Sequence, residues 1–288
     1  MEKKIFACVN GHEPSETVCD YARWFGDKTN ITIQLIHTLE RSESAILDQT
    51  SDLAGNLGLG ETDELLEELV SIEHDAKKLM LRRGKIVLEK SKRYIQSKGQ
   101  LNIEKTLLHG PLQSNLLELV DEIELLVIGR KDQSQLERKN KRLGHNAEGA
   151  VRALEVPILI VEKPFRDIDK VMLAFDGSEN SQKAVSFLSN QKRFHSCDLY
   201  LVHVGEMNQS LRDKWDKAKN DLQGECKNLH ALEIQGNIVD GLIKVQKEKQ
   251  VDFTVMGAFG QHWLKSYIIG STTSEMINRS NGALLLVR

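Results

Sequence analysis

The chain of 288 residues is 40% hydrophobic and 28% charged, with a formal net charge of -3. These values are typical of a soluble globular protein with about two domains. The slightly acidic balance argues against a general nucleic-acid binder, which needs a clustered basic face. No apolar run reaches the roughly 18 residues that a membrane span requires. The N-terminus, "MEKKIFACVNGHEP", is too polar for a secretory signal, so we expect a cytoplasmic protein with free thiols.

Taken in chain order, the predicted elements occur twice. Residues 3–22, "KKIFACVNGHEPSETVCDYA", align with residues 169–188, "DKVMLAFDGSENSQKAVSFL", and each segment reads as a strand followed by a helix. The next strand of each copy places His37 on His203. Further along, Gly129 aligns with Gly257, and "LEVPILIV" aligns with the closing strand "SNGALLLV". The chain is therefore two fused copies of one domain, which we place at residues 1–165 and 166–288.

The first copy carries an insertion at about residues 45–98, between its second and third strands. Leu65, Leu69 and Ile72 recur at helical spacing, with Glu and Lys at many of the other positions. This pattern predicts an amphipathic helix. Two interpretations stay open: the helix packs on its own domain, or it binds a protein partner.

Each copy reads as alternating strands and helices, which predicts a doubly wound parallel sheet. In the second copy we expect strands near residues 170–175, 198–204, 232–235, 251–256 and 283–287. Ligands of such sheets bind beyond the carboxyl ends of the strands. The closing strands "PILIV" and "ALLLV" are candidates to pair with each other within one chain, which would hide both edges.

Three glycines follow the fourth strand of the second copy, in "VMGAFGQHWLKSYIIGSTTSE" (255–275). Glycines let an anion approach the backbone, and a helix N-terminus offers unpaired N–H groups, so the segment is a candidate phosphate site. Thr272 and Glu275 have the spacing of a capping box. The alternative is that the glycines only form turns and that Ser271 or Thr272 only caps the helix.

The spacing Gly257-x2-Gly260-x9-Gly270-Ser271-Thr272 resembles the ATP-binding signature of the universal stress protein family, and Asp176-Gly177-Ser178 resembles the start of that family's domain. The resemblance covers both halves of the chain. It implies two tandem Rossmann-like α/β domains, related to adenine-nucleotide α-hydrolases, each with a five-stranded parallel sheet of order 3-2-1-4-5. It also implies that the two domains pair as the homodimeric relatives do.

Carried over by position, the resemblance implies ATP or another adenine nucleotide as ligand, with or without Mg. Asp176 would lie at the adenosine end, the backbone near Val204 would meet adenine, and Met256 would line the nucleotide. For Asp176 the alternative is that it caps the following helix. The complete set of expected binding residues is Asp176, Gly177, Ser178, Val204, Met256, Gly257, Gly260, Gly270, Ser271, Thr272 and Thr273.

The first copy departs from this pattern. Asn10 stands in place of Asp176, Asp132 replaces the second glycine, and His145 takes the hydroxyl position. A carboxylate would repel a polyphosphate, and loss of glycine restricts close approach to the backbone. We therefore expect the first domain not to bind ATP in the family's mode.

The function expected from the resemblance is a nucleotide-dependent regulatory or protective role in the stress response. The alternatives are a slow ATPase or other nucleotide-dependent enzyme, and an interaction scaffold that does not depend on nucleotide. No catalytic motif nominates a base or nucleophile. His37 and His203 lack a second ligand at metal spacing, so we interpret both as structural. The pattern allows a monomer or a homodimer.

Overall fold

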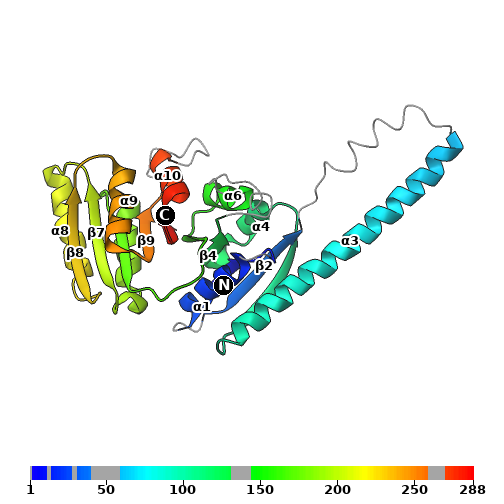
Figure 1. The fold of residues 1–288 in the computed structure, drawn as a ribbon, viewed down its shortest axis with the longest axis horizontal. Helices are drawn as coiled ribbons and strands as arrows, with labels where there is room; N and C mark the ends of the chain where they lie inside the picture. Colours follow the sequence, from blue (N-terminus) through cyan, green and yellow to red (C-terminus); the bar gives the residue numbers. More distant parts are fainter. Residues whose placement is uncertain (1, 12–13, 28–30, 40–58, 131–143, 259–269) are drawn as a thin grey trace.

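The computed structural model describes residues 2–11, 14–27, 31–39, 59–130, 144–258 and 270–288. In this part of the chain, ten strands form one continuous sheet with helices on both faces (Figure 1).

Within the described residues, the first half contains strands β1 to β5 and the helices α1, α3, α4 and α6. Their bounds are β1 (Lys4–Cys8), α1 (Pro14–Gly26), β2 (Ile33–Leu39), α3 (Leu59–Gln96), β3 (Ile103–His109), α4 (Leu112–Glu118), the 3-10 turn η1 (Val120–Glu122), β4 (Ile123–Gly129), α6 (His145–Ala153) and β5 (Ile158–Val161).

The second half repeats this order. Its elements are β6 (Lys170–Ala174), α7 (Glu179–Ser189), η2 (Lys192–Phe194), β7 (Asp198–Val204), α8 (Gln209–Leu222), β8 (Asn228–Ile234), α9 (Ile238–Lys249), β9 (Phe253–Gly257), α10 (Ser271–Arg279) and β10 (Ala283–Val287). The segment 162–169 that joins the halves has no helix or strand.

The strand order confirms the predicted fold. Across the sheet it reads β3-β2-β1-β4-β5-β10-β9-β6-β7-β8, so each half has the order 3-2-1-4-5. Within each half the pairings are parallel. The halves join where β5 and β10 pair antiparallel, with Leu159 opposite Leu285. The expected pairing of the closing strands within one chain is therefore confirmed.

Two apolar clusters cover the two faces of the sheet. Side chains of α1, α3, α7 and α8 pack on one face, and side chains of α4, α6, α9 and α10 pack on the other. Central strands such as β5 and β10 are buried along their whole length, which explains their unbroken apolar sequence. None of the described helices combines the length and apolarity of a bilayer crossing.

The third strand of the second half is longer than the sequence predicted. We expected a strand at 232–235, whereas β8 spans Asn228–Ile234. The strand lies at the edge of the sheet and is mostly exposed, so its first residues carry little of the apolar pattern that marks a buried strand.

The insertion of the first half is largely a lengthening of one helix. Helix α3 has 38 residues, whereas α8, which also lies between the second and third strands, has 14. The C-terminal part of α3 is packed, since Val87, Leu88 and Ile95 are buried in the core. From Val70 to Met80, every residue whose side chain is described is exposed. The expectation of a helix packed on its own domain is thus right only for the C-terminal part.

Aromatic side chains and Arg193 hold the two halves together beside the sheet. The ring centroid of Trp24, in the first half, lies 6.1 Å from that of Phe253 and 5.5 Å from that of Phe194, both in the second half. The guanidinium of Arg193 donates to the carbonyls of Trp24 and Phe25, the latter at 2.7 Å. Burial lowers the pKa of Arg193 to about 10, so the side chain is still charged at neutral pH.

Candidate functional site

The carboxyl ends of three strands in the second half bring the predicted residues to one edge of the sheet. Ala174 at the end of β6 pairs with Met256 of β9 on one side and with Val202 of β7 on the other. Asp176 follows β6, and Val204 ends β7. The turn after β6 and the segment after β9 therefore start side by side, as a doubly wound sheet requires of a ligand site.

The turn after β6 is ordered by its own side chains. The carboxylate of Asp176 accepts a 2.9 Å hydrogen bond from the Ser178 amide, and Asp176 is exposed. Ser178 is the N-cap of α7 and accepts from the Ser181 amide at 3.2 Å. Between them Gly177 has φ +74, a conformation that a side chain disfavours. Since Ser178 caps the helix, the Asp176 carboxylate stands outside the cap, facing solvent.

Gly257 allows β9 to end directly against the first turn of α7. A Cβ on Gly257 would lie 2.5 Å from the Ser181 nitrogen and 2.6 Å from the Asn180 carbonyl carbon. The side-chain amide of Asn180 also donates to the Ala258 carbonyl at 2.6 Å. The need for glycine at this position is therefore steric and arises from close backbone packing within the fold.

Helix α10 begins two residues earlier than the capping box predicted, since that box makes Thr272 the N-cap. Gly270 is the N-cap, with φ -54 and ψ 144, and no side chain caps the helix. Thr272 therefore lies inside the first turn, and the predicted Thr272–Glu275 capping box is wrong. Glu275 instead forms an ion pair with Arg279 at 2.5 Å.

The first turn of α10 leaves backbone donors unpaired. The first N–H groups of a helix have no partner within it, which here applies to Ser271, Thr272 and Thr273. The amide of Gly270 has no acceptor among the residues that the structure describes. Ser271 is exposed and Thr272 half-buried, whereas Thr273 is 5% exposed, on the packed face of the helix. Gly260 lies outside the described residues.

At the equivalent helix N-terminus of the first half, that of α6, the N-cap amide is already hydrogen-bonded to the backbone. There the Gly144 amide donates to the Arg130 carbonyl at 2.8 Å, just before α6 begins. Ala258, which aligns with Arg130, instead has its carbonyl bound by Asn180. Asp132 lies outside the described residues, and His145 is the first residue of α6.

The side chain of Arg130, which follows β4, binds the second half of the chain. Its guanidinium donates to the carbonyl and the hydroxyl of Ser280, both at 3.1 Å, and pairs with Glu162 at 3.0 Å. Burial lowers the pKa of this arginine, and Glu162 opposes the shift. Sequence reasoning missed this residue; its signal was a charged residue directly after a buried strand, where the second half has Ala258.

The two aligned histidines make the same bond. Nδ1 of His37 lies 2.7 Å from the Val9 carbonyl, and Nδ1 of His203 lies 2.9 Å from the Phe175 carbonyl, so each ring ties the second strand to the end of the first. With Nδ1 as donor, Nε2 of His203 is an acceptor, and it is buried without a partner in the described part of the chain. No three His, Cys, Asp or Glu residues gather as a metal site among the described residues.

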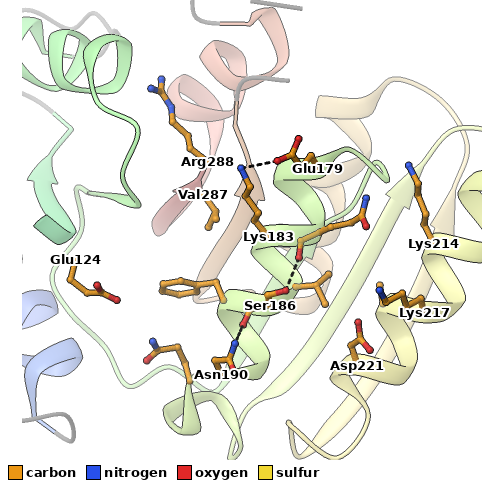
Figure 2. Close-up of a pocket in the computed structure, with 15 residues that line it drawn as sticks. Glu124, Glu179, Lys183, Ser186, Asn190, Lys214, Lys217, Asp221, Val287 and Arg288 are labelled. Atoms are coloured by element: carbon orange, nitrogen blue, oxygen red, sulfur yellow. Dashed lines mark hydrogen bonds and ion pairs between the residues drawn. The ribbon is translucent and has the colours of Figure 1, made fainter. Parts of the chain in front are cut away.

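A separate cavity of about 570 Å³ lies along α7, between α8 and the end of β10 (Figure 2). None of the binding residues expected from the sequence lines it. Its charged lining has both signs: Glu124, Glu179, Lys183, Lys214, Lys217, Asp221 and Arg288. Several of these charges are already engaged, since Lys183 pairs with Glu179 at 3.1 Å and Lys214 donates to the Gly177 carbonyl at 3.0 Å. The carboxyl edge of the second half therefore remains the stronger candidate.

Comparisons with known proteins agree with the repeat and the fold. The model of the universal stress protein family matches residues 1–162 and 167–288. Universal stress protein Slr1230 of Synechocystis is 27% identical over 289 residues, covering 99% of this chain and all of that protein. Universal stress protein MJ0577 of Methanocaldococcus jannaschii is 24% identical and covers 41% of this chain and 94% of its own length.

A solved structure supports the fold over nearly the whole chain. The crystal structure of a universal stress protein from Archaeoglobus fulgidus superposes with a TM-score of 0.72 at 17% identity, covering 99% of this chain and 98% of that one.

Proposed function

Because the chain belongs to the universal stress protein family, we propose that its second domain, residues 166–288, binds an adenine nucleotide at the carboxyl edge of β6, β7 and β9. The first domain, residues 1–165, serves as its structural partner. Occupancy of the site regulates the protein's contacts during stress.

The observation that carries this proposal is the difference between the two helix N-termini. The Gly144 amide before α6 donates a hydrogen bond to the Arg130 carbonyl, whereas the Gly270 amide before α10 has no acceptor among the described residues. An unpaired N-terminal turn attracts a phosphate group. In our proposal the amides of Gly270, Ser271 and Thr272 hold the phosphates, and the two accessible hydroxyls of Ser271 and Thr272 add donors.

In our proposal the adenosine end of the ligand lies beside Asp176 and the ends of β7 and β9. The exposed Asp176 carboxylate keeps acceptor capacity beyond its bond to the Ser178 amide, which suits a hydroxyl or amino group of adenosine. Met256 and Val204 lie at the same edge, and because their side chains are buried, in our proposal they meet the ligand through backbone atoms. Any Mg²⁺ would be held mainly by the nucleotide phosphates, which is the usual way that this ion reaches a phosphate site.

Calorimetric titration of the whole chain with ATP and Mg²⁺ tests the proposal. Ligand at about a thousand times its Kd should also stabilise the domain by about 4 kcal/mol, which a thermal scan detects. Asp176→Ala should weaken binding at least tenfold. Asn10→Ala, the matched change in the first half, should leave the affinity unchanged.

Two results would count against the proposal. One is the absence of heat and of thermal stabilisation with ATP, ADP and AMP at millimolar concentration. The other is binding that survives Asp176→Ala and is lost in Asn10→Ala, which would move the ligand to the first domain.

A further inference from the structure

We propose that the exposed half of α3 is a self-association surface, on which α3 of a second copy of this chain packs antiparallel. This pairing does not depend on nucleotide binding. The exposure, the spacing of the apolar residues and the distribution of charge along the helix all support it.

The N-terminal half of α3 extends away from the two domains (Figure 1). Between residues 70 and 80, the large apolar side chains have large exposed fractions: 65% for Val70, 52% for Ile72, 69% for Leu79 and 44% for Met80. Ile86, beside the packed part of the helix, is 58% exposed. A lone helical segment in water gains little stability from its own hydrogen bonds, so apolar residues at these positions indicate a missing partner.

The exposed residues have the spacing of a coiled-coil seam. Ile72, Leu79 and Ile86 are seven residues apart, and Ala76 stands between the first two at the alternate position of the heptad. The packed residues of the same helix, such as Leu88 and Ile95, fall on the opposite side at 100° per residue. The seam therefore faces away from the sheet and is free to take a second helix.

The charges along α3 favour a second copy in the antiparallel direction. From 59 to 75 every charged residue is Asp or Glu, and from 76 to 96 every charged residue except Glu89 is Lys or Arg. Antiparallel pairing sets the acidic half of one helix against the basic half of the other, whereas parallel pairing sets like charges together. The same polarity also complements the helix dipole, but the dipole does not explain an exposed apolar seam.

The part of the seam from Ile72 to Leu79 is nearly symmetric about Ala76. A two-fold axis beside Ala76 places Ile72 opposite Leu79 of the second copy, and Leu79 opposite its Ile72. Such a self-complementary patch is what a two-fold dimer requires. The small Ala76 side chain lets the two helices approach closely at the axis.

Cysteine cross-linking tests the direction of pairing. Under mild oxidation, Ala76→Cys should form a disulfide-linked dimer, because the two residues 76 meet at the axis. Ile86→Cys should not link to itself, because ten residues on each side of the axis separate the two positions by about 30 Å. The wild-type chain, with its four native cysteines, gives the background. Self-linking at both positions would show a parallel pair and overturn the proposal.

Sedimentation velocity over a range of concentrations tests the seam itself. The wild-type chain should dimerise, and Leu79→Glu should raise the dimer Kd at least tenfold. The exposure of Leu79 predicts that the melting temperature of the monomer will not change. The control is Lys85→Glu, which places the same charge on the side of the helix away from the seam. It should change the dimer Kd far less. A wild-type monomer at 100 µM, or a dimer that Leu79→Glu leaves intact, would refute the proposal.

Discussion

Gly257 and Gly270 belong to one sequence motif but have different physical roles. A Cβ at Gly257 would meet the backbone of Asn180 and Ser181 at 2.5 to 3.0 Å, whereas at Gly270 its nearest neighbour is Thr273 Oγ1 at 3.9 Å. We predict that Gly257→Ala lowers stability by about 1–3 kcal/mol, the usual cost of overpacking. Gly270→Ala should cost less than about 1 kcal/mol. Urea unfolding of the two variants measures this difference, and equal losses would contradict it.

Because the thiol of Cys19 is buried, the free energy of unfolding should change with pH in the alkaline range. Burial raises the pKa of Cys19 from 9.0 to about 12. Between these values the native chain holds a proton that the unfolded chain releases, so the thiol's contribution is complete below pH 9 and falls as the pH rises. The slope approaches about 1.4 kcal/mol per pH unit for one thiol. Cys19→Ala should flatten urea-midpoint profiles above pH 9 and leave their slope at pH 7 to 8 unchanged.

At the scale of the element, α3 combines two parts with different dependence on the rest of the molecule. From Val70 to Met80 every described side chain is exposed, so we predict that deleting residues 70–80 leaves the melting temperature within a few degrees of wild type. Leu88→Ala, in the packed part, should cost about 2–5 kcal/mol. Thermal scans of the two variants compare these effects. A deletion that unfolds the chain would show that the N-terminal part supports the core.

Sequence patterns predicted the existence of most elements but not all of their ends. The apolar runs of β5 and β10 were sufficient to predict buried strands and their pairing, since few other structures accommodate such residues. The capping box placed the start of α10 two residues late, because a Thr–Glu spacing is only a local signal and the true N-cap, Gly270, has no side chain to mark it. The helical periodicity of α3 could not show which of its residues the sheet covers.

At the scale of the whole molecule, the repeat predicted the domain order, and the family resemblance supplied the strand order 3-2-1-4-5. The contacts between the halves were beyond prediction. Arg193 reaches Trp24 and Phe25 across nearly 170 positions of sequence, and Arg130 reaches Ser280 across 150. No local pattern encodes such partners. The expected binding residues of the second domain and the domain boundary stay predictions.

The bonds of Arg193 give a prediction about the cohesion of the two halves. Arg193→Met keeps apolar contact with the aromatic cluster but leaves two buried carbonyls short of a charged donor, which should cost about 3 kcal/mol. Arg212→Met removes an exposed ion pair with Glu233 and should leave the urea midpoint almost unchanged. Tryptophan fluorescence during urea unfolding measures both variants. Equal midpoints would mean that Arg193 contributes no more than a surface charge.

The two domains that meet at the β5–β10 pairing belong to one polypeptide, joined through residues 162–169, so their ratio is fixed at one to one. A dimer of identical subunits carries two equivalent pockets, and filling one can alter the other. Here each joined pair has a single proposed pocket, so at concentrations where the chain is monomeric, saturation should follow a simple hyperbola with a Hill coefficient of 1. Gene fusion would then have converted a potentially cooperative receptor into a graded sensor of nucleotide concentration.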